Sequence, residues 1–133
     1  MTVFADTYAL IAWLNRDDPD HERVEAYLAA FRGRLVTTEW VLVELADALC
    51  APAVRAKTAA FLRVVRDTAK FDIVGYSDET YEAGFELFAA RADKGWSLTD
   101  CISFAVMTAR GLTDALTADR HFEQAGFLAV FKT

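Results

Sequence analysis

The stretch VFADTYALIAWLN, residues 3–15, contains the change of pattern that decides the fold. Residues 3–5 form a short apolar run that is typical of a buried strand, whereas the apolar side chains of residues 8–14 recur at helical spacing. Asp6 stands between the two patterns. The sequence therefore predicts a strand that leads directly into a helix, with a carboxylate at the junction.

Short strands and helices alternate in the same way along the rest of the chain. Further strands are predicted at 35–36, 71–74, 115–117 and 128–131. Helices are predicted at 24–31, 40–50, 54–67, 80–92, 99–110 and 120–124. Because strands that alternate with helices form parallel sheets, we expect an α/β fold in which a parallel sheet is sandwiched between α-helices, as a single domain over residues 1–133.

The composition is that of one globular domain. A chain of 133 residues that is 54% hydrophobic, with only six Gly and two Pro, can bury one core and is not disordered. The apolar N-terminus has no basic segment and is interrupted by Asp6, so we expect no signal peptide, no membrane association and a cytoplasmic location. Cys50 and Cys101 form no metal-binding motif, and in a reducing compartment we expect both to be buried small side chains.

The net charge bears on nucleic-acid binding. With 20 acidic and 14 basic residues the formal charge is -6, which disfavours wide, non-specific binding of nucleic acid. Carboxylates that converge on divalent cations would change this locally, because the bound ions offset the negative charge and can contact phosphate themselves.

Four carboxylates stand where an acid is unfavourable without a partner. Asp6 and Asp119 each follow a predicted strand, and the carboxyl ends of parallel strands lie at one edge of the sheet. Glu44 interrupts the apolar helix segment VLVELA, and Asp100 opens the buried helix after Trp96. We expect the two helix-borne acids to lie over the same edge as Asp6 and Asp119.

Acids gathered in this way repel one another and raise each other's pKa unless a cation lies between them. Mg²⁺ or Mn²⁺ prefers carboxylate oxygens, and the chain lacks the thiolate and imidazole clusters that favour zinc. Such ions polarise a phosphodiester, orient a water for in-line attack and stabilise the leaving oxygen. The four acids therefore predict a metal site for phosphodiester chemistry.

A purely structural role is the alternative for several of these residues. Asp6, Asp100 and Asp119 could each cap a helix, whereas Glu44 has no evident basic neighbour on its apolar helix. The adjoining Thr7, Ser97 and Thr117 could either orient the carboxylates or cap helices.

Two further polar residues lie near the predicted site in the sequence. Asp93 is a reserve fifth acid. His121 lies two positions after Asp119 and could touch substrate, but a single imidazole beside a short helix favours a structural interpretation.

Each of the four acids lies in a characteristic segment, and the segments follow one another over nearly the whole chain: VFADTYALIAWLN, TTEWVLVELADAL, WSLTDCISFAVM and LTADRHFEQAGF. Together they resemble the successive acidic motifs of VapC-type PIN domains, the ribonuclease toxins of bacterial toxin-antitoxin pairs. On this resemblance the family's metal-coordinating and catalytic acids fall on Asp6, Glu44, Asp100 and Asp119.

The resemblance implies a PIN fold and Mg²⁺- or Mn²⁺-dependent hydrolysis of RNA by an activated water, which leaves 5′-phosphate and 3′-hydroxyl ends. It also implies inhibition by a VapB-like antitoxin and suggests a homodimer. We expect an apolar helix of the antitoxin to enter a groove between the early helices.

Two rival functions belong to other classes. A catalytically degenerate PIN fold would serve as a protein-binding module, although the presence of all four acids argues against it. A phosphatase or phosphotransferase could use Asp6 as a covalent nucleophile, but such a motif needs a second aspartate at position 8, where this chain has Tyr8.

Overall fold

A five-stranded parallel sheet runs through the computed structural model, which describes residues 1–132. The strand order is β3-β2-β1-β4-β5, and each neighbouring pair is parallel. The strands are β1 (Thr2–Ala5), β2 (Arg34–Thr38), β3 (Phe71–Val74), β4 (Asp114–Leu116) and β5 (Leu128–Ala129).

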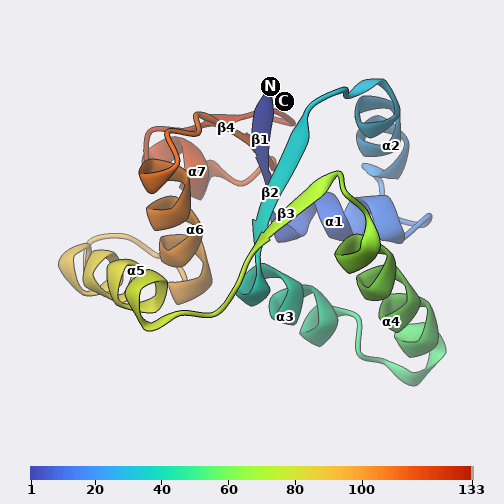
Figure 1. Cartoon of the computed structure of the whole chain (residues 1–133), viewed down its shortest axis with the longest axis horizontal. Helices are drawn as coiled ribbons and strands as arrows, with labels where there is room; N and C mark the ends of the chain where they lie inside the picture. Colours follow the sequence, from blue (N-terminus) through green and yellow to red (C-terminus); the bar gives the residue numbers. More distant parts are fainter. Residues whose placement is uncertain (133) are drawn as a thin grey trace.

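Helices cover both faces of this sheet. They are α1 (Thr7–Leu14), α2 (His21–Ala30), α3 (Glu39–Ala48), α4 (Pro52–Asp67), α5 (Asp78–Ala90), α6 (Leu98–Ala109) and α7 (Arg120–Gln124). Figure 1 shows α1, α2 and α4 on one side of the sheet and α5, α6 and α7 on the other, while α3 contacts both α1 and α6. The predicted α/β sandwich is confirmed.

The central strand β1 is buried because helices cover it from both sides. Val3, Phe4 and Ala5 are all at most 1% exposed. A strand enclosed in this way needs apolar side chains on both faces. This explains the continuous apolar run at residues 3–5. A strand with one solvent-exposed face would instead show alternating apolar and polar residues.

The order of the strands places a crevice beside β1. The chain runs from β1 outward through β2 and β3, then returns to the other side of β1 to form β4 and β5. In open α/β sheets ligands bind where the strand order reverses in this way, outside the carboxyl ends of the strands. Ala5 pairs with Leu116, so the residues that follow β1 and β4 meet at that crevice.

The bounds predicted for the helices and strands differ from the observed ones by up to three residues. The last strand covers residues 128–129 and not 128–131, although the backbone of Val130 and Phe131 still donates to β4 and the residue after it. Cys101 is buried as expected, but Cys50 is exposed because α3 ends before it; both are free thiols. Among residues 1–132 no helix has the length and apolar character needed to cross a membrane.

Helices α5 and α6 are in close contact at Gly84. A Cβ at this position would lie 2.3 Å from Cγ1 of Ile102 and 2.8 Å from its Cα. Only a residue without a side chain lets the two helix backbones come this close, and the contact fixes α5 against the helix that carries Asp100.

We expect Gly84→Ala to lower the free energy of unfolding by roughly 1–3 kcal/mol, because overpacking against a backbone outweighs the gain in helix propensity of about 1 kcal/mol. Gly75→Ala is the matched control, since an added methyl group there meets nothing within 4 Å. Urea unfolding of the three proteins measures the difference. Equal stability of Gly84→Ala and the wild type would show that the helices can separate without loss.

Candidate metal centre

A cavity of about 470 Å³ opens at the carboxyl ends of β1 and β4. The structure brings the four acids singled out in the sequence around this cavity: Asp6, Glu44, Asp100 and Asp119. The other residues that line it are Thr7, Tyr8, Gly95, Ser97, Ala118 and His121. No Lys or Arg is among the described residues of the lining, so only His121 can offer the acids a positive charge.

Asp6 is the most buried of the four acids, with 6% of its surface exposed. It occupies the N-cap position of α1 without making a side-chain capping bond, so capping does not account for it. Thr117 Oγ1 donates to Asp6 Oδ2 at 2.9 Å. Burial raises the pKa of Asp6 to about 7, with smaller contributions from the charges of Asp100 and Glu44.

Glu44 reaches the cavity from α3. This helix begins after Thr38, whose side chain caps it by accepting from the backbone N–H of Val41. The Thr7 hydroxyl donates to Glu44 Oε1 and thereby connects the first residue of α1 with α3. Thr7 therefore orients a carboxylate, one of the two roles that the sequence left open for it.

Asp100 takes part in the cap of α6 and also lines the cavity. Ser97 accepts from the backbone N–H of Asp100 at 3.0 Å, and Asp100 Oδ2 accepts from the backbone N–H of Ser97, which forms a capping box at the start of α6. The pKa of Asp100 is raised chiefly by burial, against the lowering effect of hydrogen bonds from Ser97 and His121.

Asp119 caps the short helix α7 by accepting from the backbone N–H of His121 at 2.9 Å. The backbone N–H of Asp119 donates to Thr117 Oγ1 at 3.1 Å, and the same hydroxyl donates to Asp6. One buried threonine thus links the acids that follow β1 and β4.

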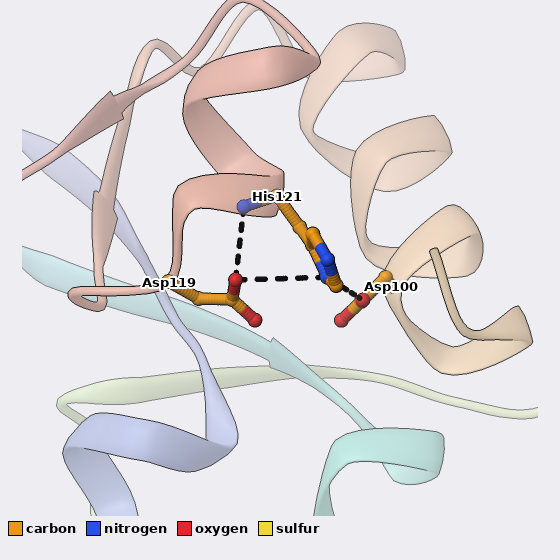
Figure 2. A group of neighbouring side chains, drawn as sticks. All are labelled: Asp100, Asp119 and His121. Atoms are coloured by element: carbon orange, nitrogen blue, oxygen red, sulfur yellow. Dashed lines mark hydrogen bonds and ion pairs between the residues drawn. The ribbon is translucent and has the colours of Figure 1, made fainter. Parts of the chain in front are cut away.

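His121 lines the cavity together with the acids, in keeping with the non-structural role that the sequence also left open for it. Figure 2 shows its ring between Asp100 and Asp119, with Nδ1 at 3.2 Å from Asp100 Oδ2 and 3.6 Å from Asp119 Oδ1. The three side chains each offer a donor atom within 4.8 Å of the other two. The feature of the sequence that pointed to His121 was its position two residues after Asp119, an acid that follows a predicted strand.

Aromatic packing holds this part of the site in place. Phe122, the residue after His121, is fully buried and packs edge-on against Phe104 of α6 at a centroid distance of 4.9 Å. It also contacts Phe4 of β1. Because Phe104 lies one helical turn after Asp100, these contacts set the position of α7 relative to that acid.

Asp93 does not belong to the site. It is largely exposed and pairs with Arg91 at 3.0 Å, outside the cavity lining. Cys101 follows Asp100 but is buried, and burial raises the pKa of its thiol. The thiol therefore stays protonated in the metal-free protein, and Cys101 is not among the residues that line the cavity.

The residues of the cavity fit a divalent metal ion. Their donors are carboxylate oxygens and one imidazole, a set that suits Mg²⁺ or Mn²⁺. A metal-free protein must instead accommodate several acids, with Asp6 retaining a proton up to about pH 7. Both the donor chemistry and the repulsion therefore favour a bound cation.

Comparison with known families identifies the fold. The model of the PIN domain family matches residues 3–128. No protein with curated annotation matches the sequence.

Solved structures of toxin and toxin-antitoxin proteins share this fold. VapC20 from Mycobacterium tuberculosis, a toxin that cleaves the sarcin-ricin loop, has a TM-score of 0.88 at 24% identity over 96% of this chain and 98% of its own. FitAcB from Neisseria gonorrhoeae has a TM-score of 0.70 at 19% identity over 99% of this chain and 97% of its own. VapBC2 from Rickettsia felis, bound to a promoter DNA fragment, has a TM-score of 0.67 at 15% identity over 97% of this chain and 96% of its own.

We expect the contribution of Asp6 to the stability of the metal-free protein to become less favourable as the pH rises from about 4 to about 7. Between these values folded Asp6 still holds its proton, whereas an unfolded aspartate with a pKa near 3.8 has released it. The folded state then binds more protons, so raising the pH favours unfolding. Relative to wild type, Asp6→Asn should gain roughly 1–3 kcal/mol at pH 8 in EDTA and much less at pH 4.

Thermal melting of both proteins across this pH range measures the effect. Asp93→Asn is the control, because that carboxylate is exposed and paired with Arg91. A constant difference between Asp6→Asn and wild type at all pH values would contradict the raised pKa.

Proposed function

The chain belongs to the PIN-domain family, and on that premise we propose that it is a metal-dependent ribonuclease of the VapC type. The observation that carries the proposal is the cavity at the carboxyl ends of β1 and β4, where four carboxylates gather without a Lys or Arg among the described lining residues. The likeness in fold to VapC20, a toxin that cleaves an RNA loop, supports RNA as the substrate.

Asp6, Glu44, Asp100 and Asp119 would hold the cation, which we propose to be Mg²⁺ or Mn²⁺. When bound, such an ion activates water toward phosphorus and stabilises the leaving oxygen. Thr7 and Thr117 fix the orientation of Glu44 and Asp6 by donating hydrogen bonds to them. The positive charge of the ion also answers the objection raised by the net charge of -6, because it attracts the phosphate locally.

The rival functions find less support in the site. A binding module without catalysis gives no reason for four acids to converge on one cavity. A covalent aspartyl mechanism would need an acid at position 8, but Tyr8 stands there and its hydroxyl donates to Asp20.

Cleavage should require Mn²⁺ or Mg²⁺ and stop in excess EDTA. Water as the nucleophile leaves 5′-phosphate and 3′-hydroxyl ends, whereas attack by the ribose 2′-hydroxyl would leave a cyclic phosphate. Sequencing of RNA ends after expression of the wild type and an inactive variant identifies both the chemistry and the target. Undiminished cleavage in EDTA, or cyclic phosphate ends, would overturn the mechanism.

Asp100→Asn should reduce cleavage by roughly 100-fold or more, since it removes a charged ligand. The fold should be unchanged or slightly more stable without metal, because the Asn side-chain oxygen can still accept from the backbone N–H of Ser97 in the capping box and repulsion among the acids falls. The measurement is paired: melting in EDTA and cleavage with saturating Mn²⁺, with Asp93→Asn as the matched control outside the cavity. Near-wild-type cleavage by Asp100→Asn would show that Asp100 is not needed to bind the cation and serves only in the capping box of α6.

We further propose that a VapB-like antitoxin inhibits the enzyme by docking an amphipathic helix on a groove formed by α1, α2 and α4. The groove has a volume of about 370 Å³ and an apolar floor that includes Trp13 and Phe61. Arg16 and Lys57 are exposed at its lining, which favours a partner helix flanked by acidic residues.

The length of α1 connects this groove with the acids. Its eight residues extend about 12 Å, from Thr7 at the cavity to Trp13 and Leu14 at the groove. A partner segment that follows α1 would therefore reach the carboxylates with a basic or polar side chain.

Val64→Asp should abolish neutralisation by the antitoxin and leave RNA cleavage unchanged. Val64 lines the groove and is 61% exposed, so the new charge disfavours an apolar partner without disturbing the core. Val54→Asp is the control on the same helix outside the groove. Co-expression with the neighbouring small gene and measurement of growth tests both. Continued neutralisation of Val64→Asp, or harmless overexpression with no companion gene, would contradict the assignment.

A further inference from the structure

His121 lies where a metal ligand would be expected, although the sequence resemblance assigns only carboxylates. Its side chain is 25% exposed, and Nδ1 points between Asp100 and Asp119 (Figure 2). The distances from Nδ1 to the nearest oxygens of these acids are 3.2 and 3.6 Å. Two neighbouring ligands of one octahedral ion, each bonded at about 2.1 Å, lie about 3 Å apart, so this spacing is close to that of a shared ion.

The fold holds the ring in this position. The backbone N–H of His121 donates to the Asp119 side chain, which ties the residue to the acid that caps its helix. The next residue, Phe122, is fully buried against Phe104 of α6. The ring is therefore presented to Asp100 by packed elements and not by a mobile surface segment.

The ring nitrogen of His121 cannot form full hydrogen bonds to both of the carboxylates that face it. Nδ1 carries at most one hydrogen and can donate it fully to one of the two carboxylates that face it. A divalent cation placed among the three donor atoms would bind both oxygens and the nitrogen at once. The three atoms lie within 4.8 Å of one another, which leaves a site of this size.

We propose that His121 Nδ1 is a ligand of the cation together with Asp100 and Asp119, and that it makes the site select Mn²⁺ over Mg²⁺. This inference rests on the proposed metal dependence. Imidazole suits transition metals, whereas Mg²⁺ prefers oxygen donors and retained water. A site built from the four acids alone would discriminate less between the two ions.

Binding of Mn²⁺ alone to the full chain tests the proposal. Pulsed electron paramagnetic resonance detects a ¹⁴N nucleus bonded to Mn²⁺, and titration gives the affinities for Mn²⁺ and Mg²⁺. The chain has two histidines, so His21→Asn is the matched control. His21 contacts the carbonyl of Ala12 and Glu25, and it lies outside the cavity lining.

We expect a nitrogen coupling in the wild type and in His21→Asn, and its loss in His121→Asn. The Mn²⁺ affinity of His121→Asn should fall by about 10-fold or more, while its Mg²⁺ affinity changes by less than about 3-fold. Melting in EDTA verifies that the variant is folded. If it is not, the presence or absence of nitrogen coupling in the wild type still decides the matter.

Other outcomes would overturn the inference. Mn²⁺ binding by the wild type without nitrogen coupling would exclude His121 as a ligand and leave the proposed ribonuclease function intact. Equal losses of Mn²⁺ and Mg²⁺ affinity in His121→Asn, again without nitrogen coupling in the wild type, would mean that the residue only positions the carboxylates. Failure of the wild type to bind either ion would overturn the proposed function itself.

Discussion

Burial of the Asp6 carboxylate at the end of the central strand is the constraint on which the site depends. Strand β1 is covered on both faces, so the residue that follows it has little access to water. A carboxylate in such a place is fully ionised at neutral pH only if a positive charge compensates for the lost hydration. The negative charges of Asp100 and Glu44 raise the pKa of Asp6 further, so they increase the need for a compensating positive charge. The fold thus creates the need for a cation before any ion is bound.

The surrounding structure keeps the acids together despite their repulsion. Thr117 bridges Asp6 and the backbone of Asp119, and Thr7 holds Glu44. Buried aromatic contacts fix the helices that carry the remaining groups. A site that is preorganised in this way binds its ion with little rearrangement, and the stability lost to repulsion is offset by packing at some distance from the cavity.

The sequence predicted the features that follow from local pattern. The apolar run at 3–5 indicated a buried central strand, and the rule that ligands bind at the carboxyl ends of strands placed Asp6 and Asp119 at one edge. The role of His121 stayed open between substrate contact and a structural position, because the direction of its side chain depends on how α7 packs against α6, a contact between distant segments. Asp93 was held in reserve as a fifth acid, but it pairs with Arg91 in an exposed turn whose conformation the sequence pattern does not show. Pattern therefore identifies strand-end acids, whereas side-chain direction on a short helix depends on tertiary packing.

The two surfaces to which we assign functions, the groove and the cavity, come from different parts of the polypeptide. The groove of α1, α2 and α4 is lined by residues from Trp13 to Phe71, whereas the cavity also needs Asp100, Asp119 and His121. Chains are synthesised from the N-terminus, at about 5–20 residues per second. A growing polypeptide therefore contains every residue of the groove well before it contains the full set of acids. The part of the chain that a partner would bind is made seconds ahead of the part that completes the metal centre.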